Sequence, residues 1–204
     1  NAGYKVYGVD TNESIINSLN KKKVHINEPK INELLIKNIE QERFIPTKES
    51  VKADIFLIAV PTPFQKINEK NINSIPIPDI NFVEHAISMI SKVCEPNSLV
   101  IIESTCPVGT SEKMYNLLLE KSGIRRGEIK FAYCPERVLP GQIIEELIKN
   151  DRVVGGINYE SSLTAQEFYK SFCKGNISIT NSKTAELVKL TENSFRDINI
   201  AFAN

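Results

Sequence analysis

The amino-acid sequence predicts an α/β fold, a doubly wound parallel sheet that is followed by the start of a long helix. Apolar runs typical of strands alternate with helical runs along most of the 204 residues, which indicates a parallel sheet flanked by helices. Several of the strand-like runs are almost continuously apolar, as expected where both faces of a sheet are covered. Polar residues directly follow these runs, at the strand ends where open α/β sheets bind ligands.

The first part of the chain begins this alternation. A buried strand is predicted over KVYGVD (5–10), and the helix after it has Thr11 or Asn12 as its N-cap. Helical spacing follows in KINELLIKNIEQERF (30–44). The run ADIFLIAV (53–60) is predicted to be a buried strand.

The middle of the chain continues in the same way. Helices are predicted over 80–94 and 111–119, and strands over 98–104 and 128–134. The polar connection 61–79 is rich in Asn, Pro and Lys, and we expect a mobile surface loop beside the site.

The last part of the chain ends in a helix. After a short acidic helix come a strand over RVVGG (152–156), a helix over 161–173 and a strand over 176–180. The run 183–204 is helical, and neither Gly nor Pro terminates it.

Asp10 indicates what kind of sheet this is. An acid at the end of the second strand of a dinucleotide-binding unit holds the ribose hydroxyls, about 20 residues after a glycine-rich turn. The chain contains no such turn, which is consistent with a Rossmann-like fold whose first β-α unit is missing. Alternatively, Asp10 only starts a turn or caps a helix. We expect three regions: a dinucleotide-binding core (1–157), an α/β continuation of it (158–181) and the start of a long helix (182–204).

Composition excludes several classes of function. Lysine plus arginine and aspartate plus glutamate each number 25, so no overall charge favours nucleic acid or a membrane surface. No stretch approaches the roughly 20 apolar residues of a membrane span, and the cytoplasm is the expected compartment. The four cysteines form no Cys-x-x-Cys pair and only two histidines are present, so we expect free thiols and no metal centre.

Two consecutive strand ends carry hydroxyl groups and prolines. Val60, Pro61 and Thr62 end one predicted strand, while Ser104 and Thr105 end the next. Hydroxyls and backbone N–H groups in such places suit phosphate or ribose contacts. The alternative is that Ser and Thr here only cap the helices that follow.

Two further groups of charged residues lie near strand ends and on the last helix. Glu136 and Arg137 follow one strand and Arg152 begins the next, a charge set that suits an anionic, hydroxyl-rich substrate. Lys189 and Asn193 are one helical turn apart, so both project from one face. They suit oxyanion stabilisation, although a solvated helical face would show the same spacing.

Longer motifs favour the functional interpretation. Asp10 and the runs AVPTP, ESTCPVGT, YCPERVLPG, KNDRVVGG and AELVKLTENSFRDINIAFAN occur in the order found in the UDP-glucose/GDP-mannose dehydrogenase family. This resemblance covers essentially the whole chain. The runs YCPERVLPGQ and KLTENSFRDINIAFAN look most like those of members that oxidise UDP-N-acetyl-D-mannosamine. UDP-glucose members usually have Asn-Pro-Glu-Phe-Leu where this chain has CPERV (134–138).

The resemblance implies an NAD-dependent four-electron oxidation of the C6 hydroxyl of UDP-N-acetyl-D-mannosamine. The product would be UDP-N-acetyl-D-mannosaminuronate, a precursor of surface polysaccharide. Sister enzymes acting on UDP-N-acetylglucosamine, UDP-glucose or GDP-mannose are the nearest alternatives. The family also implies a homodimer that packs through the long central helix.

The family's site residues carry over to matching positions. Asp10 would hold the ribose, and the absence of a following Arg favours NAD over NADP. Glu136 would be the active-site carboxylate and general base, and Lys189 and Asn193 would hold oxyanions and water. The resemblance places Val60, Pro61, Thr62, Ser104 and Thr105 in the cofactor cleft, with Thr105 also reaching the catalytic water. The resemblance also makes Arg137, Pro140, Gly141 and Arg152 candidates for substrate or subunit contacts.

Two parts of the family pattern are not in this chain. Neither the glycine-rich loop nor a nucleophilic cysteine in a Gly-Gly-x-Cys setting occurs, so the fragment alone is expected to be inactive. A 3-hydroxyacid dehydrogenase would share the fold and a helical lysine but would not need the CPERVLPG run. A non-catalytic binding or assembly module is the alternative from another class. The parent reading frame would distinguish these possibilities.

Overall fold

A computed structural model describes residues 2–24, 28, 30–65, 75–138 and 141–204. The strands are β1 (Val6–Val9), β2 (Phe44–Thr47), β3 (Ile55–Ile58), β4 (Leu99–Ile102), β5 (Lys130–Tyr133), β6 (Arg152–Gly156) and β7 (Ile177–Asn181). The helices are α1 (Glu13–Asn20), α2 (Ile31–Glu40), α3 (Asn81–Ile90), α4 (Thr110–Ser122), α5 (Ile143–Lys149), α6 (Tyr159–Lys170) and α7 (Ser182–Ala203). The predicted α/β fold is confirmed.

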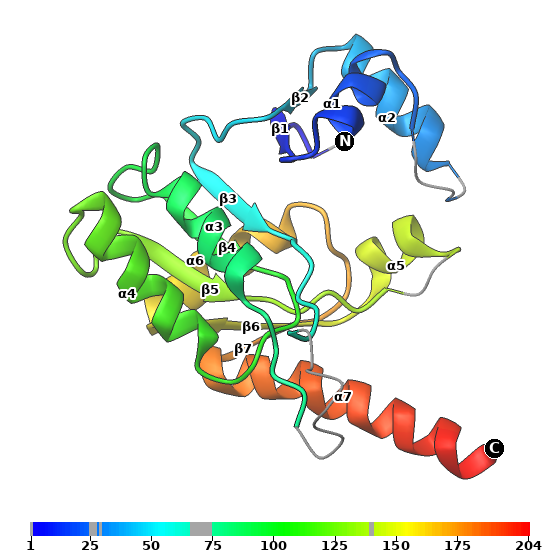
Figure 1. Ribbon diagram of the computed structural model, residues 1–204, viewed down its shortest axis with the longest axis vertical. Coiled ribbons are helices and arrows are strands. Elements are labelled where there is room, and N and C mark those ends of the chain that lie inside the picture. Colours follow the sequence, from blue (N-terminus) through cyan, green and yellow to red (C-terminus); the bar gives the residue numbers. More distant parts are fainter. Residues whose placement is uncertain (1, 25–27, 29, 66–74, 139–140) are drawn as a thin grey trace.

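The main sheet has five strands in the order β3-β4-β5-β6-β7, and β1 and β2 form a separate parallel pair (Figure 1). The strands β3, β4 and β5 are parallel, as predicted, but β6 runs antiparallel to β5, and β7 is parallel to β6. A parallel neighbour needs a crossover back along the sheet. The chain instead leaves β5, forms the short helix α5 and returns directly as β6.

Helices cover both faces of the main sheet, which makes it doubly wound. Successive residues of β4 point to opposite faces. Val100 and Ile102 join a cluster with buried residues of α3, α4 and the start of α7. Leu99 and Ile101 join a second cluster, with α6. All four β4 side chains are buried, so this strand lies at the centre of the core.

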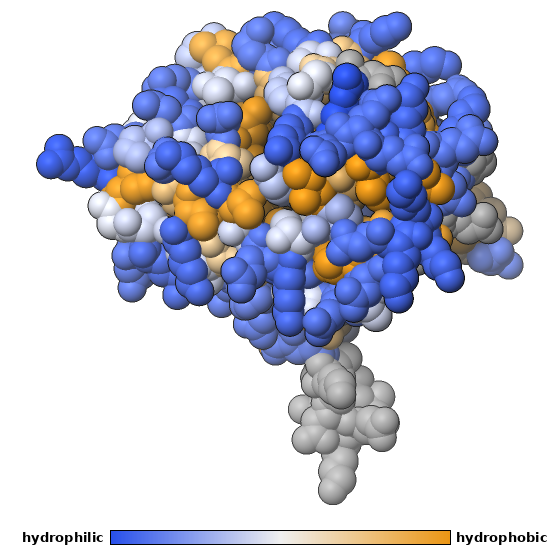
Figure 2. Space-filling view, turned by 90° about the horizontal axis from the view of Figure 1, so that it is seen from above, coloured by the Kyte–Doolittle hydropathy of each residue, from blue (hydrophilic) through white to orange (hydrophobic). Residues whose placement is uncertain are grey.

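Two strands that were predicted to be buried are partly exposed. Val6 and Val9 of β1 are 46% and 42% exposed, and Leu57 of β3 is 47% exposed. Within the described residues, β1 pairs only with β2 and β3 only with β4. Apolar composition indicates that a strand can be covered, whereas the described layers leave apolar side chains of both strands exposed. The face seen from the β1–β2 end is mostly hydrophilic, with hydrophobic residues in a broken band across its middle (Figure 2).

The helix predicted over 30–44 is too long at its C-terminal end. The helix α2 ends at Glu40, and Phe44 begins the strand β2. Glu42 has a φ of 54°, which turns the chain out of the helix. Pro46 lies within β2 opposite Gly8, and a proline is tolerated there because β2 is an edge strand.

The other predicted elements lie close to their observed positions. Asn12 is the N-cap of α1, where its side chain accepts a hydrogen bond from the Ser14 N–H. The predicted loop 61–79 is described only at its two ends, which meet through a bridge between Phe64 and Pro78. In the part of the chain that the structure describes, no helix combines the length and apolarity needed to cross a membrane.

Candidate cofactor and substrate site

Ser104 joins the carboxyl ends of β3 and β4, which lie at the same edge of the sheet. Its hydroxyl accepts a hydrogen bond from the Val60 N–H at 2.8 Å and lies 2.8 Å from the Val60 carbonyl oxygen. The Ser104 side chain is buried. This hydroxyl therefore fixes the loop that leaves β3.

Thr62 makes the second link between these loops. Its hydroxyl donates to the Thr105 carbonyl oxygen at 2.7 Å. Thr62 and Thr105 are half-buried, while Pro61 is exposed between the two links. The structure thus brings together the five residues that the sequence predicts for the cofactor cleft.

The N-terminus of α4, which the sequence offered as a phosphate site or a capped end, binds a carboxylate of the chain itself. Glu186 of α7 accepts hydrogen bonds from the Gly109 N–H at 2.6 Å and from the Ser111 N–H and hydroxyl at 2.7 and 2.6 Å. Its side chain is fully buried. A helix N-terminus favours an anion, and here Glu186 supplies it. Thr110 donates instead to the Pro107 carbonyl oxygen.

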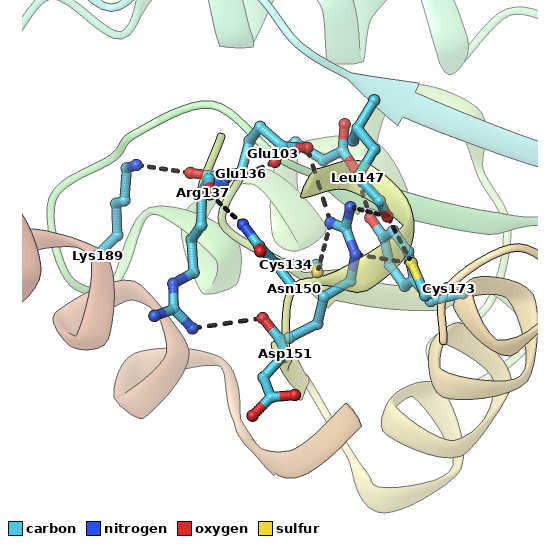
Figure 3. Close-up of polar contacts among 11 residues, drawn as sticks. Glu103, Cys134, Glu136, Arg137, Leu147, Asn150, Asp151, Cys173 and Lys189 are labelled. Carbon is cyan, nitrogen blue, oxygen red and sulfur yellow. Dashed lines mark hydrogen bonds and ion pairs between the residues drawn. The ribbon is translucent and has the colours of Figure 1, made fainter. Parts of the chain in front are cut away.

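Glu136 lies in the loop after β5, facing α7. Its backbone carbonyl accepts a hydrogen bond from the Lys189 ammonium at 2.6 Å. One carboxylate oxygen accepts from the Arg137 N–H at 2.7 Å, and the other lies 3.7 Å from the Arg152 guanidinium. The Glu136 side chain is 32% exposed, so its carboxylate remains accessible to a ligand. Figure 3 shows Lys189 reaching this loop from α7.

The Lys189 ammonium is half-buried. Burial lowers the pKa of Lys189 below its ordinary value, although the Glu192 carboxylate works against this shift. Asn193 lies one turn further along α7 and is also half-buried. A desolvated ammonium beside an amide suits the stabilisation of a developing oxyanion.

Arg137 fixes the same loop from two sides. Its guanidinium forms an ion pair with Glu192 of α7 at 2.6 Å and donates to the Asp151 carbonyl oxygen at 3.3 Å. The Asn150 amide donates to the Arg137 carbonyl oxygen at 2.9 Å. The Glu136 loop is therefore held both by α7 and by the segment that enters β6.

Arg152 is buried beneath the site, with 4% of its side chain exposed. Besides approaching Glu136, its guanidinium donates to the Cys173 sulfur at 2.9 Å and to the Leu147 carbonyl oxygen at 3.3 Å. It also lies 4.8 Å from the centre of the Tyr169 ring. In this arrangement Arg152 supports Glu136 from within the protein instead of facing a ligand.

Neither strand-end cysteine has the character of a nucleophile. Burial raises the pKa of both Cys106 and Cys134 to about 12. Both thiols are therefore neutral at physiological pH, whereas a reactive cysteine has a lowered pKa. In the described residues, no group of His, Cys, Asp and Glu side chains is arranged to hold a metal ion.

The remaining predicted residues lie apart from this cluster. Asp10 directly follows β1 of the smaller sheet, and one of its carboxylate oxygens accepts from the Asn12 N–H at 2.8 Å. The Gly141 N–H donates to the Glu28 carboxylate at 2.8 Å, and Pro140 lies outside the described residues. Asp10 is only half-buried, so its carboxylate fits the ribose of a dinucleotide while also shaping the turn.

Sequence reasoning missed the roles of Glu186, Tyr169 and Cys173. The partners of the first two are remote in sequence, because Glu186 binds Ser111 and Tyr169 binds Glu103. The only signal for Glu186 was its place one turn before Lys189. No local pattern marked the other two.

Comparison with known proteins identifies the domain. Residues 1–173 match the model of the NAD binding domain of the UDP-glucose/GDP-mannose dehydrogenase family. The chain is 44% identical to a UDP-N-acetyl-D-mannosamine dehydrogenase from Campylobacter jejuni and 45% identical to one from Escherichia coli, with 98% of the chain aligned to each. The alignments cover 49% and 48% of those proteins, so the chain spans about half their length.

A solved structure shows the same arrangement of elements. The UDP-D-ManNAc dehydrogenase from Pyrococcus horikoshii superimposes with a TM-score of 0.91 and 39% sequence identity. This superposition includes 99% of the present chain and 47% of the other. With its matching NAD-binding domain and its strand-end site, the chain belongs to the UDP-glucose/GDP-mannose dehydrogenase family.

Proposed function

We propose that the whole protein is an NAD-dependent UDP-N-acetyl-D-mannosamine 6-dehydrogenase. It would act in the cytoplasm, where it oxidises the C6 hydroxyl of the sugar to a carboxylate. The resulting uronate would be a precursor of surface polysaccharide. The observation that carries the reaction class is the Lys189 ammonium, held 2.6 Å from the Glu136 carbonyl oxygen at the carboxyl end of the sheet. The choice of sugar is supported by the 44–45% identity to dehydrogenases of that name.

The residues of this chain would divide the work. NAD, when bound, accepts the hydride, and Asp10, Val60, Pro61, Thr62 and Ser104 would hold it. The Lys189 ammonium would stabilise the negative charge that develops on the C6 oxygen. The Glu136 carboxylate would accept a proton, because it is accessible and its position is fixed by Arg137 and Arg152.

Water is needed for the second oxidation, and two residues suit it. Asn193 lies one turn from Lys189, and Thr105 lies in the loop after β4. We propose that both orient the water that enters the carboxylate. Arg137 and Gly141 would line the sugar-nucleotide side.

The helix α7 supports a homodimer of the whole protein. It carries large apolar residues that are more than half exposed: Leu187, Phe195, Ile198, Ile200 and Phe202. An exposed apolar face of this kind favours association with another subunit. We propose that α7 packs against its counterpart in a second copy.

The test is the yield of NADH per sugar, measured on the full-length protein with limiting UDP-N-acetyl-D-mannosamine. Two NADH per sugar are expected, since alcohol to carboxylate removes four electrons. Replacing Lys189 by Ala should lower kcat by about 100- to 1000-fold, as for the loss of an oxyanion donor. Replacing Lys183 by Ala, which breaks an exposed ion pair of the same helix, should leave kcat unchanged.

Other yields would contradict the proposal in different ways. One NADH per sugar would indicate a simple alcohol dehydrogenase. Turnover only with another nucleotide sugar would retain the reaction and overturn the substrate. A relative from Ralstonia solanacearum named NDP-N-acetyl-D-galactosaminuronic acid dehydrogenase is 40% identical, so UDP-N-acetyl-D-galactosamine belongs in the comparison.

A further inference from the structure

Glu186 connects α7 to the cofactor side of the sheet through a fully buried carboxylate. Its two oxygens take three short hydrogen bonds from the N-terminus of α4, at 2.6, 2.7 and 2.6 Å. This N-terminus follows the loop that contains Thr105. The carboxylate therefore ties the start of α7 to the loop after β4.

Glu186 shares a helix face with Lys189 and Asn193, which follow three and seven residues later. On the other side of Lys189, Glu192 is paired with Arg137 at 2.6 Å. Lys189 is thus placed between two fixed points. One fixed point is on the loop after β4, and the other is on the loop after β5.

We infer that Glu186 is a positioning residue for the reaction. By binding the N-terminus of α4, it holds α7 close enough to the sheet for Lys189 to reach the Glu136 loop. The inference rests on the proposed function, because the oxyanion role of Lys189 gives it a kinetic consequence. Glu186 is buried and faces α4, so it acts through Lys189 and not on the substrate.

A neighbouring contact provides a matched control. Lys183 also joins α7 to α4, through an ion pair with Glu112 at 3.0 Å. Both side chains of that pair are more than half exposed. A variant of Lys183 therefore breaks a link between the same two helices without removing the buried anchor.

The kinetic test compares Glu186→Gln and Lys183→Ala in the full-length protein with saturating NAD. Gln cannot satisfy both N–H groups, because its amide nitrogen presents hydrogens to one of them. We expect kcat with UDP-N-acetyl-D-mannosamine to fall on the order of 100-fold, as for a small misplacement of a catalytic group, with KM within about twofold. Lys183→Ala should keep the wild-type kcat.

The pH dependence of kcat provides a second measurement, because a variant that is only less stable would not shift it. Lys189 faces Glu136 and Arg137 from the loop after β5, and Glu192 and Arg196 on its own helix. If α7 moves outward in Glu186→Gln, Lys189 regains water and its pKa rises. The alkaline limb of kcat should then shift to higher pH.

Hydrogen exchange provides a test that does not need turnover. Positioning predicts faster amide exchange in residues 134–138, which Glu186 does not touch, together with residues 105–111. Faster exchange in 105–111 alone, with an unchanged kcat and pH profile, would overturn the inference. If Glu186→Gln does not fold, Ser111→Ala removes one of the three hydrogen bonds and should show a smaller effect of the same kind.

The controls separate this inference from the proposed function. A wild-type protein that makes no NADH from any nucleotide sugar would refute the proposed function, and the exchange result would still decide on the anchor. If the wild type produces NADH and Glu186→Gln has the same kcat, pH profile and hydrogen exchange, the positioning role of Glu186 would be refuted and the proposed function would stand.

Discussion

At the scale of single residues, Glu103 is an acid held largely away from water at the end of β4. The Tyr169 hydroxyl donates a hydrogen bond to its carboxylate at 2.6 Å. Burial raises the pKa of Glu103 above its ordinary value of 4.5, and the hydrogen bond from Tyr169 works against this shift. The desolvation effect wins, so the folded protein binds this proton more tightly than the unfolded chain does.

A pH dependence of stability follows. Between pH 4.5 and the raised pKa, the folded state carries more proton than the unfolded state, so this contribution to stability falls as pH rises through that window. The Gln side chain of Glu103→Gln does not titrate, so this variant lacks the decrease in stability with rising pH. We therefore expect the melting temperature of the wild type, relative to Glu103→Gln, to decrease as pH rises above 4.5.

The measurement is thermal unfolding of the full-length protein across that range. The exposed Glu120→Gln provides the control for removing one acid from the surface. Parallel curves for the wild type and Glu103→Gln would show that the buried acid has no such effect.

Residues of the candidate site were predictable where the strand pattern located them. Glu136 and Arg137 follow an apolar strand directly, and Lys189 and Asn193 share one face of a helix by spacing alone. Glu186 was different, because its role depends on a contact with Ser111, 75 residues away. Such a contact is fixed by tertiary packing, which leaves no periodicity in the sequence.

At the scale of elements, the packing of β6 against α7 depends on a glycine. A Cβ on Gly155 would clash with the backbone carbonyl of Asn181 and lie 2.7 Å from the Ala185 Cβ. Asn181 is the N-cap of α7, where its side chain accepts from the Thr184 N–H. Gly155 therefore lets the start of α7 approach the sheet.

We predict that Gly155→Ala destabilises the domain by about 1–3 kcal/mol, because a backbone atom must move. The comparison variant is Gly8→Ala, whose Cβ would meet the Phe44 ring. A ring can rotate away, so this variant should lose less. Thermal unfolding of the full-length proteins provides the measurement, and equal losses would contradict the argument.

The elements also show where sequence patterns stop being informative. RVVGG in β6 has an apolar pattern that fits a parallel or an antiparallel strand equally well. The direction was set by the short return through α5, which the pattern does not encode. Phe44 was assigned to a helix because the apolar spacing of residues 30–44 continues through it, but the helix ends at Glu40 and Phe44 begins β2.

At the scale of the whole molecule, α7 extends away from the body of the domain, and the C-terminus lies at its far end (Figure 1). Its apolar side chains are exposed, with Phe195 at 71%, Ile198 at 68% and Phe202 at 92%. These three positions fall on one face of the helix. Burying a phenylalanine side chain contributes roughly 1.5–3 kcal/mol, so such a face can support a stable dimer.

If a second copy covers this face, then charge placed on it will separate the subunits. We predict that the full-length double variant Phe195→Asp, Phe202→Asp has half the wild-type mass in solution, because two carboxylates would be buried without partners. Tyr159→Asp is the control, since Tyr159 is 71% exposed in the first turn of α6, where an acid is favourable. Light scattering after size exclusion gives the mass. A double variant that keeps the wild-type mass, or a monomeric wild type, would show that α7 does not form the interface.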